Sequence, residues 1–317
     1  MKHHHTRIIC GFLLMAQLYA CTEFIEPSVA EKQVTLLAPA DQYESGEYMQ
    51  NFWWDEVEYA LSYRFQVVTP SFGSPAKLVL DTLISGSEQF RVILDPGLYE
   101  WRVRAENGSS HTAYATRGFR IYRSSIKEQQ VILALPANNT LTNQADATYS
   151  WSKLYGSTRY RLQVDTNNFA DESKLVFNAT TPNLGYTVPL SANKIQYWRV
   201  RAENDTEQSK WSDIYKIVSD QLAPATVALT LPDDNKVLPK PVSLQWAVVT
   251  GTKSYELVVM KSDSATPYSS AFPVTLNGTS YSFNESAATG KLYWKVRAID
   301  EAGNRGAYSA VRGFTIQ

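Results

Sequence analysis

The sequence predicts an all-β protein built from three copies of one domain, because two markers recur at nearly constant spacing. The first marker is a tryptophan nine residues before a tyrosine, found at Trp54 and Tyr63, at Trp151 and Tyr160, and at Trp246 and Tyr255. The second is a Trp-basic-Val-Arg-Ala string, found at 101–105, 198–202 and 294–298. The period is 95 to 97 residues, which is the length of a whole domain rather than of a solenoid unit.

Within each copy, apolar and polar residues alternate as they do in strands that bury one face. The clearest run in the middle copy is expected to point three residues toward a core, namely Tyr160, Leu162 and Val164. Their neighbours are expected to face solvent, namely Arg161, Gln163 and Asp165. One buried face and one wet face per strand is typical of antiparallel sheets packed as a sandwich. About seven such strands fit into each copy, which is the immunoglobulin-like number.

The middle copy resembles the bacterial fibronectin type III pattern through Trp151, the runs 160–164 and 197–204, and the pair Trp211-Ser212. The first copy adds Leu-Asp-Pro-Gly-Leu-Tyr at 94–99, which is similar to that family's turn into strand F. The resemblance implies that Tyr99 makes a corner hydrogen bond that ties this turn to the sandwich. Gln196 and Leu292 stand at the same place in the other two copies.

We therefore predict an all-β fold of three tandem immunoglobulin-like (fibronectin type III-like) β-sandwiches. The markers place the three domains at 34–123, 129–219 and 224–317. The links between them are short, and Pro224 stiffens the second link.

The first twenty residues are typical of an export signal, with two basic residues before an apolar run over 8–18. That run is shorter than the roughly 20 apolar residues that span a bilayer. It ends in Leu18-Tyr19-Ala20-Cys21, which resembles the lipobox of bacterial lipoproteins, where the cysteine becomes the lipidated first residue. We predict a signal peptide at 1–20, lipidation at Cys21 and a tether over 21–33. The alternative is ordinary cleavage nearby, with Cys21 incidental.

Cysteine usage favours the lipid anchor. Cys10 lies in the segment to be removed, so Cys21 is the single cysteine of the mature chain and no internal disulfide can form. Glu23 and Glu26 follow soon after, and early acids resemble the surface-export signal of lipoproteins from glycan-foraging Gram-negative bacteria. This resemblance implies a lipid-anchored protein of the outer membrane at the cell surface. A plain solvated tether is the alternative.

Composition disfavours several functional classes. The net charge is −1 for the whole chain and −3 once residues 1–20 are removed, so nucleic-acid binding is not expected. The mature chain keeps one histidine, His111, which is too few for a zinc site of several His or Cys ligands and disfavours a catalytic triad. The cluster at 233–235 favours a turn over a calcium site. We therefore predict no catalytic residue, no metal and no cofactor, and that the chain is not an enzyme.

Three outward aromatic residues are the candidate ligand-binding positions, namely Trp53, Tyr197 and Tyr293. Trp53 precedes a core tryptophan at a position where the other copies have Ser150 and Gln245. Both tyrosines are followed on the same face by a pair of basic residues. Such rings stack on sugars, contact a partner or a neighbouring domain, or simply form the surface of a sheet.

Two functional hypotheses follow. The leading one is a non-catalytic, membrane-anchored surface lipoprotein that acts as an adhesion or protein-interaction module. The alternative is a glycan-binding accessory lipoprotein of an outer-membrane oligosaccharide uptake system. The partners expected are the membrane, through the lipid, and an unknown protein or glycan. Because this fold hosts many unrelated binding tasks, the step from fold to function rests on analogy.

Overall fold

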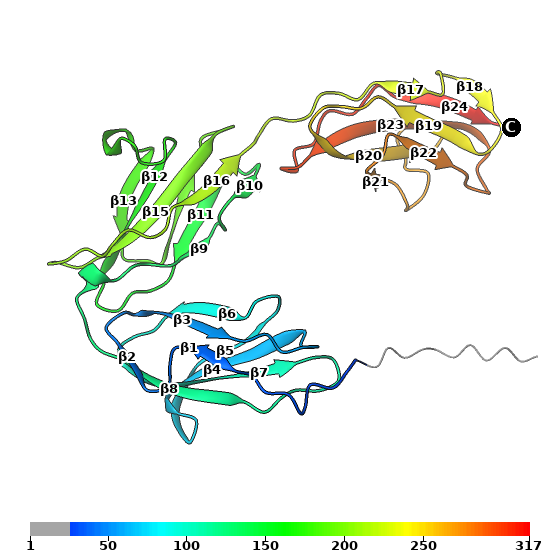
Figure 1. Ribbon diagram of the computed structural model, residues 1–317. Helices are drawn as coiled ribbons and strands as arrows, with labels where there is room; N and C mark the ends of the chain where they lie inside the picture. Colours follow the sequence, from blue (N-terminus) through cyan, green and yellow to red (C-terminus); the bar gives the residue numbers. More distant parts are fainter. Residues whose placement is uncertain (1–25) are drawn as a thin grey trace, which may run out of the picture. The chain divides into compact units, whose positions relative to one another are not determined.

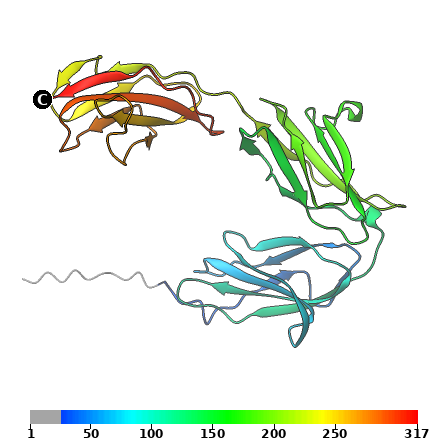
Figure 2. The ribbon, with the colours of Figure 1, turned by 180° about the vertical axis from the view of Figure 1, so that it is seen from behind.

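The structure, a computed structural model, describes residues 26–317 (Figure 1), so the predicted signal peptide and Cys21 lie outside the described residues. The predicted fold class is confirmed, because the chain forms three β-sandwiches, each made of a three-stranded and a five-stranded sheet (Figures 1 and 2). Two short 3₁₀ turns, η1 (Ile126–Glu128) and η2 (Glu172–Lys174), interrupt the strands. Over residues 26–317, no helix is long and apolar enough to cross a bilayer.

The first sandwich is formed by β1 (Leu36–Ala38), β2 (Tyr43–Ser45), β3 (Met49–Trp54), β4 (Ser62–Ser71), β5 (Ser74–Ile84), β6 (Gln89–Ile93), β7 (Gly97–Glu106) and β8 (Ala115–Ile121). One sheet has the order β1-β3-β6 and the other the order β2-β8-β7-β4-β5. Strand β5 is therefore an edge strand. Its antiparallel register against β4 shifts twice, once between Val67 and Val68 and once between Thr69 and Pro70.

The second sandwich is formed by β9 (Leu133–Leu135), β10 (Thr140–Thr142), β11 (Asp146–Trp151), β12 (Arg159–Asp165), β13 (Phe177–Thr181), β14 (Gly185–Pro189), β15 (Ile195–Glu203) and β16 (Tyr215–Ser219). Its sheets have the orders β14-β11-β9 and β10-β16-β15-β12-β13. This is the strand order of the first sandwich, so the sequence repeat corresponds to a repeat of topology.

The third sandwich is formed by β17 (Leu229–Leu231), β18 (Lys236–Leu238), β19 (Val242–Trp246), β20 (Thr252–Met260), β21 (Val274–Leu276), β22 (Ser280–Phe283), β23 (Gly290–Asp300) and β24 (Arg312–Ile316). Its sheets, β17-β19-β22 and β18-β24-β23-β20-β21, repeat the same order again. In this sandwich the edge strand that corresponds to β5 is the short β21.

Two tryptophans fill each interior, one from each sheet, and all six side chains are buried: Trp54 and Trp101, Trp151 and Trp198, Trp246 and Trp294. In the first sandwich, Phe52 and Phe65 pack between the sheets with ring centroids 4.9 Å apart, and Phe52 lies equally close to Trp101. Burying a large apolar side chain stabilises a fold by about 3 kcal/mol at most. Each buried tryptophan therefore contributes to the stability of its sandwich together with the other core residues.

The tyrosine of the first sequence marker anchors the loop before its strand. In each copy its hydroxyl accepts a hydrogen bond from a backbone N–H six residues earlier, at 2.8 to 3.0 Å: Val57 to Tyr63, Leu154 to Tyr160 and Val249 to Tyr255. The three loops thus have one length and one attachment point. Residues at the same distance before the tyrosine are therefore structurally equivalent.

Tyr99, the predicted corner residue, is buried and stacks on Phe119 with ring centroids 5.3 Å apart. Its corner hydrogen bond stays a prediction. At the equivalent places, Gln196 accepts a hydrogen bond from the Ser191 backbone N–H at 3.0 Å, and Leu292 joins the hydrophobic core.

The prediction of a wet outer face is wrong for part of the second sandwich. Gln163 and Asp165 point away from the core, as the alternation requires, yet they are only 4% and 2% exposed. Gln163 accepts hydrogen bonds from Arg199, and Asp165 accepts two backbone N–H groups of the following turn. Side chains of the same domain therefore cover this face, a layer that the alternation of one strand does not reveal.

Tyr149 offers a stability test. Its hydroxyl is buried without a hydrogen-bond partner among the described residues, and burial raises its pKa to about 12. Because an unpaired buried hydroxyl costs about 1–3 kcal/mol, we expect Tyr149→Phe, which copies Phe52 of the first sandwich, to raise the free energy of unfolding by about 1 kcal/mol in urea titrations. Tyr160→Phe is the control and should lower it, because that hydroxyl is bonded. Equal effects of the two changes would contradict the assignment.

Candidate functional site

Trp53 is the most exposed large aromatic residue on the small sheets. It lies on β3 between the buried residues Phe52 and Trp54, so strand alternation turns its ring outward, and it is 50% exposed. The cross-strand partner of Trp53 on β1 is Ala38. In the other copies the large apolar side chain lies on the edge strand instead. Leu135 on β9 lies opposite Ser150 on β11, and Leu231 on β17 lies opposite Gln245 on β19. Only the first sandwich places its large side chain on the middle strand.

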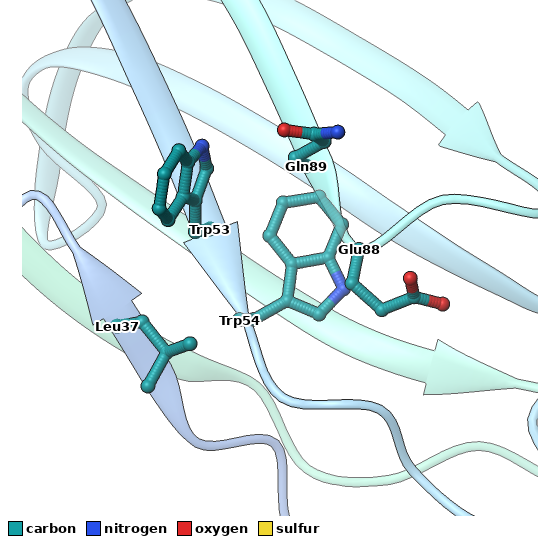
Figure 3. A pocket seen from close by; sticks show the side chains of 5 residues that line it. All are labelled: Leu37, Trp53, Trp54, Glu88 and Gln89. Carbon is teal, nitrogen blue, oxygen red and sulfur yellow. The ribbon is translucent and has the colours of Figure 1, made fainter.

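A shallow hollow of about 190 Å³ adjoins Trp53. Figure 3 shows Leu37 on β1, Trp53 on β3 and Gln89 on β6, which are neighbouring strands of one sheet. Leu37 is 49% exposed, and Glu88 adds a carboxylate to the lining. Apolar surface with a few polar groups at its rim is the usual composition of a binding surface.

The other two candidate aromatics are half-buried and lie in different sandwiches. Tyr197 sits on β15 between Asp165 and Lys216 of the neighbouring strands. Tyr293 sits on β23, where the Lys291 ammonium lies 5.2 Å from its ring centroid. Each of the three candidates thus belongs to a separate domain. A ligand-binding role for Tyr197 and Tyr293 stays a prediction.

The basic residues that follow the two tyrosines are engaged within their own domains. In the second sandwich the guanidinium carbons of Arg199 and Arg201 lie 4.3 and 4.6 Å from the Trp211 ring centroid. Arg199 also lies 4.1 Å from the Phe169 centroid. Such cation–π contacts contribute about 0.5–2 kcal/mol each. They hold the arginines against the sheet, where the Arg199 side chain is only 11% exposed.

The same stack occurs in the other two sandwiches. Tyr114 covers Arg102 and Arg104 at 4.0 and 4.9 Å. Tyr308 covers Lys295 and Arg297 at 4.4 and 4.5 Å. Neither Tyr114 nor Tyr308 was among the candidate residues predicted from the sequence. The signal was available, because each ring follows the tryptophan of the second marker by 13 or 14 residues.

In the second and third sandwiches, a buried carboxylate also binds one of the arginines that the aromatic ring covers. Glu203 accepts hydrogen bonds from Arg161 and Arg201 at 2.8 and 2.9 Å. Burial disfavours its charge, but these two arginines outweigh that effect and hold the pKa of Glu203 below its usual value. Glu256 is likewise buried, and hydrogen bonds from Tyr308 and Arg297 lower its pKa despite the burial.

These carboxylates make stability depend on acid pH. Because each folded-state pKa is lowered, the stabilisation is present above the unfolded pKa, about 4.3, and is lost as the pH falls through the folded value. We expect Glu203→Gln to lower the free energy of unfolding of the second sandwich by about 2 kcal/mol at pH 7 and to flatten its decline toward pH 3, measured by urea unfolding. Glu172→Gln, which removes an exposed ion pair to Arg199, is the control and should change little.

The remaining candidate groups form turns or surface. His111 is exposed on the loop after β7. Asp234, from the cluster considered for calcium, accepts the Gly313 N–H at 2.7 Å. Asp263 accepts a hydrogen bond from the Thr266 hydroxyl and from two backbone N–H groups, which lowers its pKa to about 2. Within residues 26–317, no group of three His, Cys, Asp or Glu side chains is placed to hold a metal ion.

Comparisons with known proteins find similarity among solved structures alone. No family model matches the chain, and no curated protein matches it. The FN1–FN3 domains of chicken CNTN1 are similar at 16% identity with a TM-score of 0.42, covering 89% of this chain and 97% of that one. Fibronectin(III)-like modules of CbhA from Clostridium thermocellum are similar at 13% identity with a TM-score of 0.40, covering 59% and 94%.

At these TM-scores the assignment rests on the strand order within each sandwich. A three-stranded sheet facing a five-stranded one occurs three times in the same order. The chain is therefore a tandem array of fibronectin type III-like sandwiches.

Proposed function

We propose that this chain is a non-catalytic binding protein, held at the outer membrane by a lipid on Cys21 and displayed at the cell surface, where it acts in adhesion or protein interaction. The observation that carries the proposal is the exposed Trp53 beside Leu37 on the first sandwich. Buried tryptophan contacts are among the strongest contributors to protein interfaces. A partner that covers Trp53 and Leu37 would remove apolar surface from water at both positions.

The anchoring part of the proposal is supported by the sequence alone. Cys21 is the single cysteine downstream of the predicted export signal. The described domains contain no second cysteine with which it could form a disulfide. A lipid thioether on Cys21 would leave all three sandwiches on the aqueous side of the membrane.

A glycan-binding accessory role in oligosaccharide uptake is the second candidate. It is favoured by the polar groups beside the ring, because Gln89 and Glu88 line the same hollow as Trp53. A sugar ring stacked on the indole would lie on a surface that also carries the Gln89 amide. The two candidates share one surface and differ in the chemistry of the ligand.

Trp53→Ser tests both candidates, because it copies the residue that the second sandwich has at this position. We expect at least a tenfold loss of binding, since a tryptophan hot spot contributes about 2 kcal/mol or more, and no change in the free energy of unfolding beyond about 0.5 kcal/mol. Binding is measured as adhesion of cells that display the chain and as signal on plant, host and microbial glycan arrays.

Leu135→Ala is the matched control, because Leu135 is an exposed leucine on the equivalent sheet of the second sandwich. Loss on the glycan array supports the glycan candidate, and loss of adhesion alone supports the protein-interaction candidate. Retention of every binding signal by Trp53→Ser would contradict both.

Lipidation has its own test. The mature protein is expected to begin at Cys21 and to carry a mass increment for acyl chains in intact-protein mass spectrometry of the membrane fraction. Cys21→Ser should abolish both the increment and the membrane association while leaving the three sandwiches folded. A membrane-bound Cys21→Ser protein would refute the anchor.

A further inference from the structure

Part of the predicted tether packs against the first sandwich. Val29 is fully buried, and its N–H donates to the Ser110 hydroxyl at 2.8 Å. One Glu26 carboxylate oxygen accepts the Gly108 N–H at 2.7 Å. The Asn107 amide donates to the Pro27 carbonyl at 2.8 Å. The chain is therefore fixed to the loop between β7 and β8 from Glu26 onward.

This attachment limits the distance between Cys21 and the domain. Five residue steps separate Cys21 from Glu26, and an extended chain covers at most about 3.6 Å per step, or roughly 18 Å in all. A lipid on Cys21 would hold the β7–β8 loop close to the membrane surface. The loop between β3 and β4 lies beside it, because the Asn107 amide also donates to the Tyr59 carbonyl at 3.2 Å.

The β3–β4 loop differs from its counterparts at two positions. Tyr59 has a φ of +68°, and the equivalent residues, four before the anchoring tyrosine, are Gly156 at +82° and Gly251 at +77°. A left-handed conformation is unfavourable for a side chain other than glycine, by about 1 kcal/mol. The first sandwich therefore keeps a large ring where the fold favours glycine.

The second difference is Leu61, which is 61% exposed. The equivalent residues, two before the anchoring tyrosine, are Thr158 and Lys253. Tyr59 is also half-exposed. One loop thus presents a tyrosine and a leucine to the outside at the end of the domain where the chain from Cys21 arrives.

We propose that the β3–β4 loop of the first sandwich inserts Tyr59 and Leu61 into the headgroup region of the membrane that holds the lipid anchor. This inference rests on the anchoring part of the proposed function. Tyrosine is favoured at membrane interfaces because its ring is apolar and its hydroxyl polar. Leucine adds apolar area to be buried among the acyl chains.

The charges around the β3–β4 loop indicate which kind of membrane surface it would bind. Lys32 lies 4.8 Å from the Tyr59 ring centroid, but its ammonium is paired with Glu58 at 2.6 Å. Glu31 and Glu56 are exposed nearby along the chain. Because Lys32 is paired and the nearby Glu31 and Glu56 are acidic, the loop is better suited to a zwitterionic membrane surface than to an anionic one. Binding by insertion of apolar side chains should then depend little on the salt concentration.

The test uses the chain from Cys21 to Gln317, which contains every described residue. Its single thiol is coupled to a maleimide lipid with one acyl chain, and partition onto phosphatidylcholine vesicles is measured. One chain alone binds weakly and reversibly, so a second contact is visible as tighter partition. We expect Tyr59→Gly/Leu61→Thr, which copies the loop of the second sandwich, to weaken partition about tenfold.

Three controls make the outcome specific. Leu78→Thr removes a leucine from β5 that is 54% exposed; it lies opposite Val68 near the far end of β4, and the change should leave partition unchanged. Raising the salt concentration should also leave it unchanged. In hydrogen exchange on vesicles, amides of 57–61 should be protected, whereas those of the equivalent loops, 154–158 and 249–253, should not.

Equal partition of the unchanged and doubly substituted chains, or no protection of 57–61 on vesicles, would overturn the proposal. Vesicle-free dimerisation that the double substitution abolishes would also overturn it, because the loop would then bind a second copy. Because the lipid is attached chemically, these outcomes do not depend on whether cells lipidate Cys21, which mass spectrometry decides separately.

Discussion

Two buried tryptophans fill the interior of each sandwich, and its two sheets pack around them. One indole comes from the small sheet and the other from the large one, as with Trp246 and Trp294, whose ring centroids lie 6.3 Å apart. Interiors packed with large rings leave little internal space for a ligand. Binding in such a domain therefore depends on outer faces and loops, where side chains vary without loss of the core.

The outer faces are not equally available. In all three copies an aromatic ring covers the two basic residues of the long central strand, and in the second and third copies a buried glutamate neutralises part of their charge. This layer fixes one face of each large sheet. The small sheet of the first sandwich, with Trp53, and its β3–β4 loop, with Tyr59 and Leu61, keep their large side chains in contact with solvent.

Most of the fold was predictable from sequence, because alternation and a fixed period report directly on strands and domains. The outward position of Trp53 followed from its place beside Trp54. What alternation cannot report is the contact between strands distant in sequence. The burial of Gln163 depends on Arg199, and the burial of Val29 depends on the β7–β8 loop, which contains Ser110. The positive φ of Tyr59 is likewise a property of the folded backbone. Its counterparts, Gly156 and Gly251, are recognised once the three loops are aligned on their anchoring tyrosines.

The two register shifts in β5 bear on how such arrays avoid aggregation. A long edge strand with apolar side chains is a template for pairing with another chain. Each shift breaks the even spacing of main-chain donors and acceptors, so an incoming straight strand cannot follow β5 along its entire length. Copies of the chain at high concentration would then remain separate molecules instead of joining into continuous sheets.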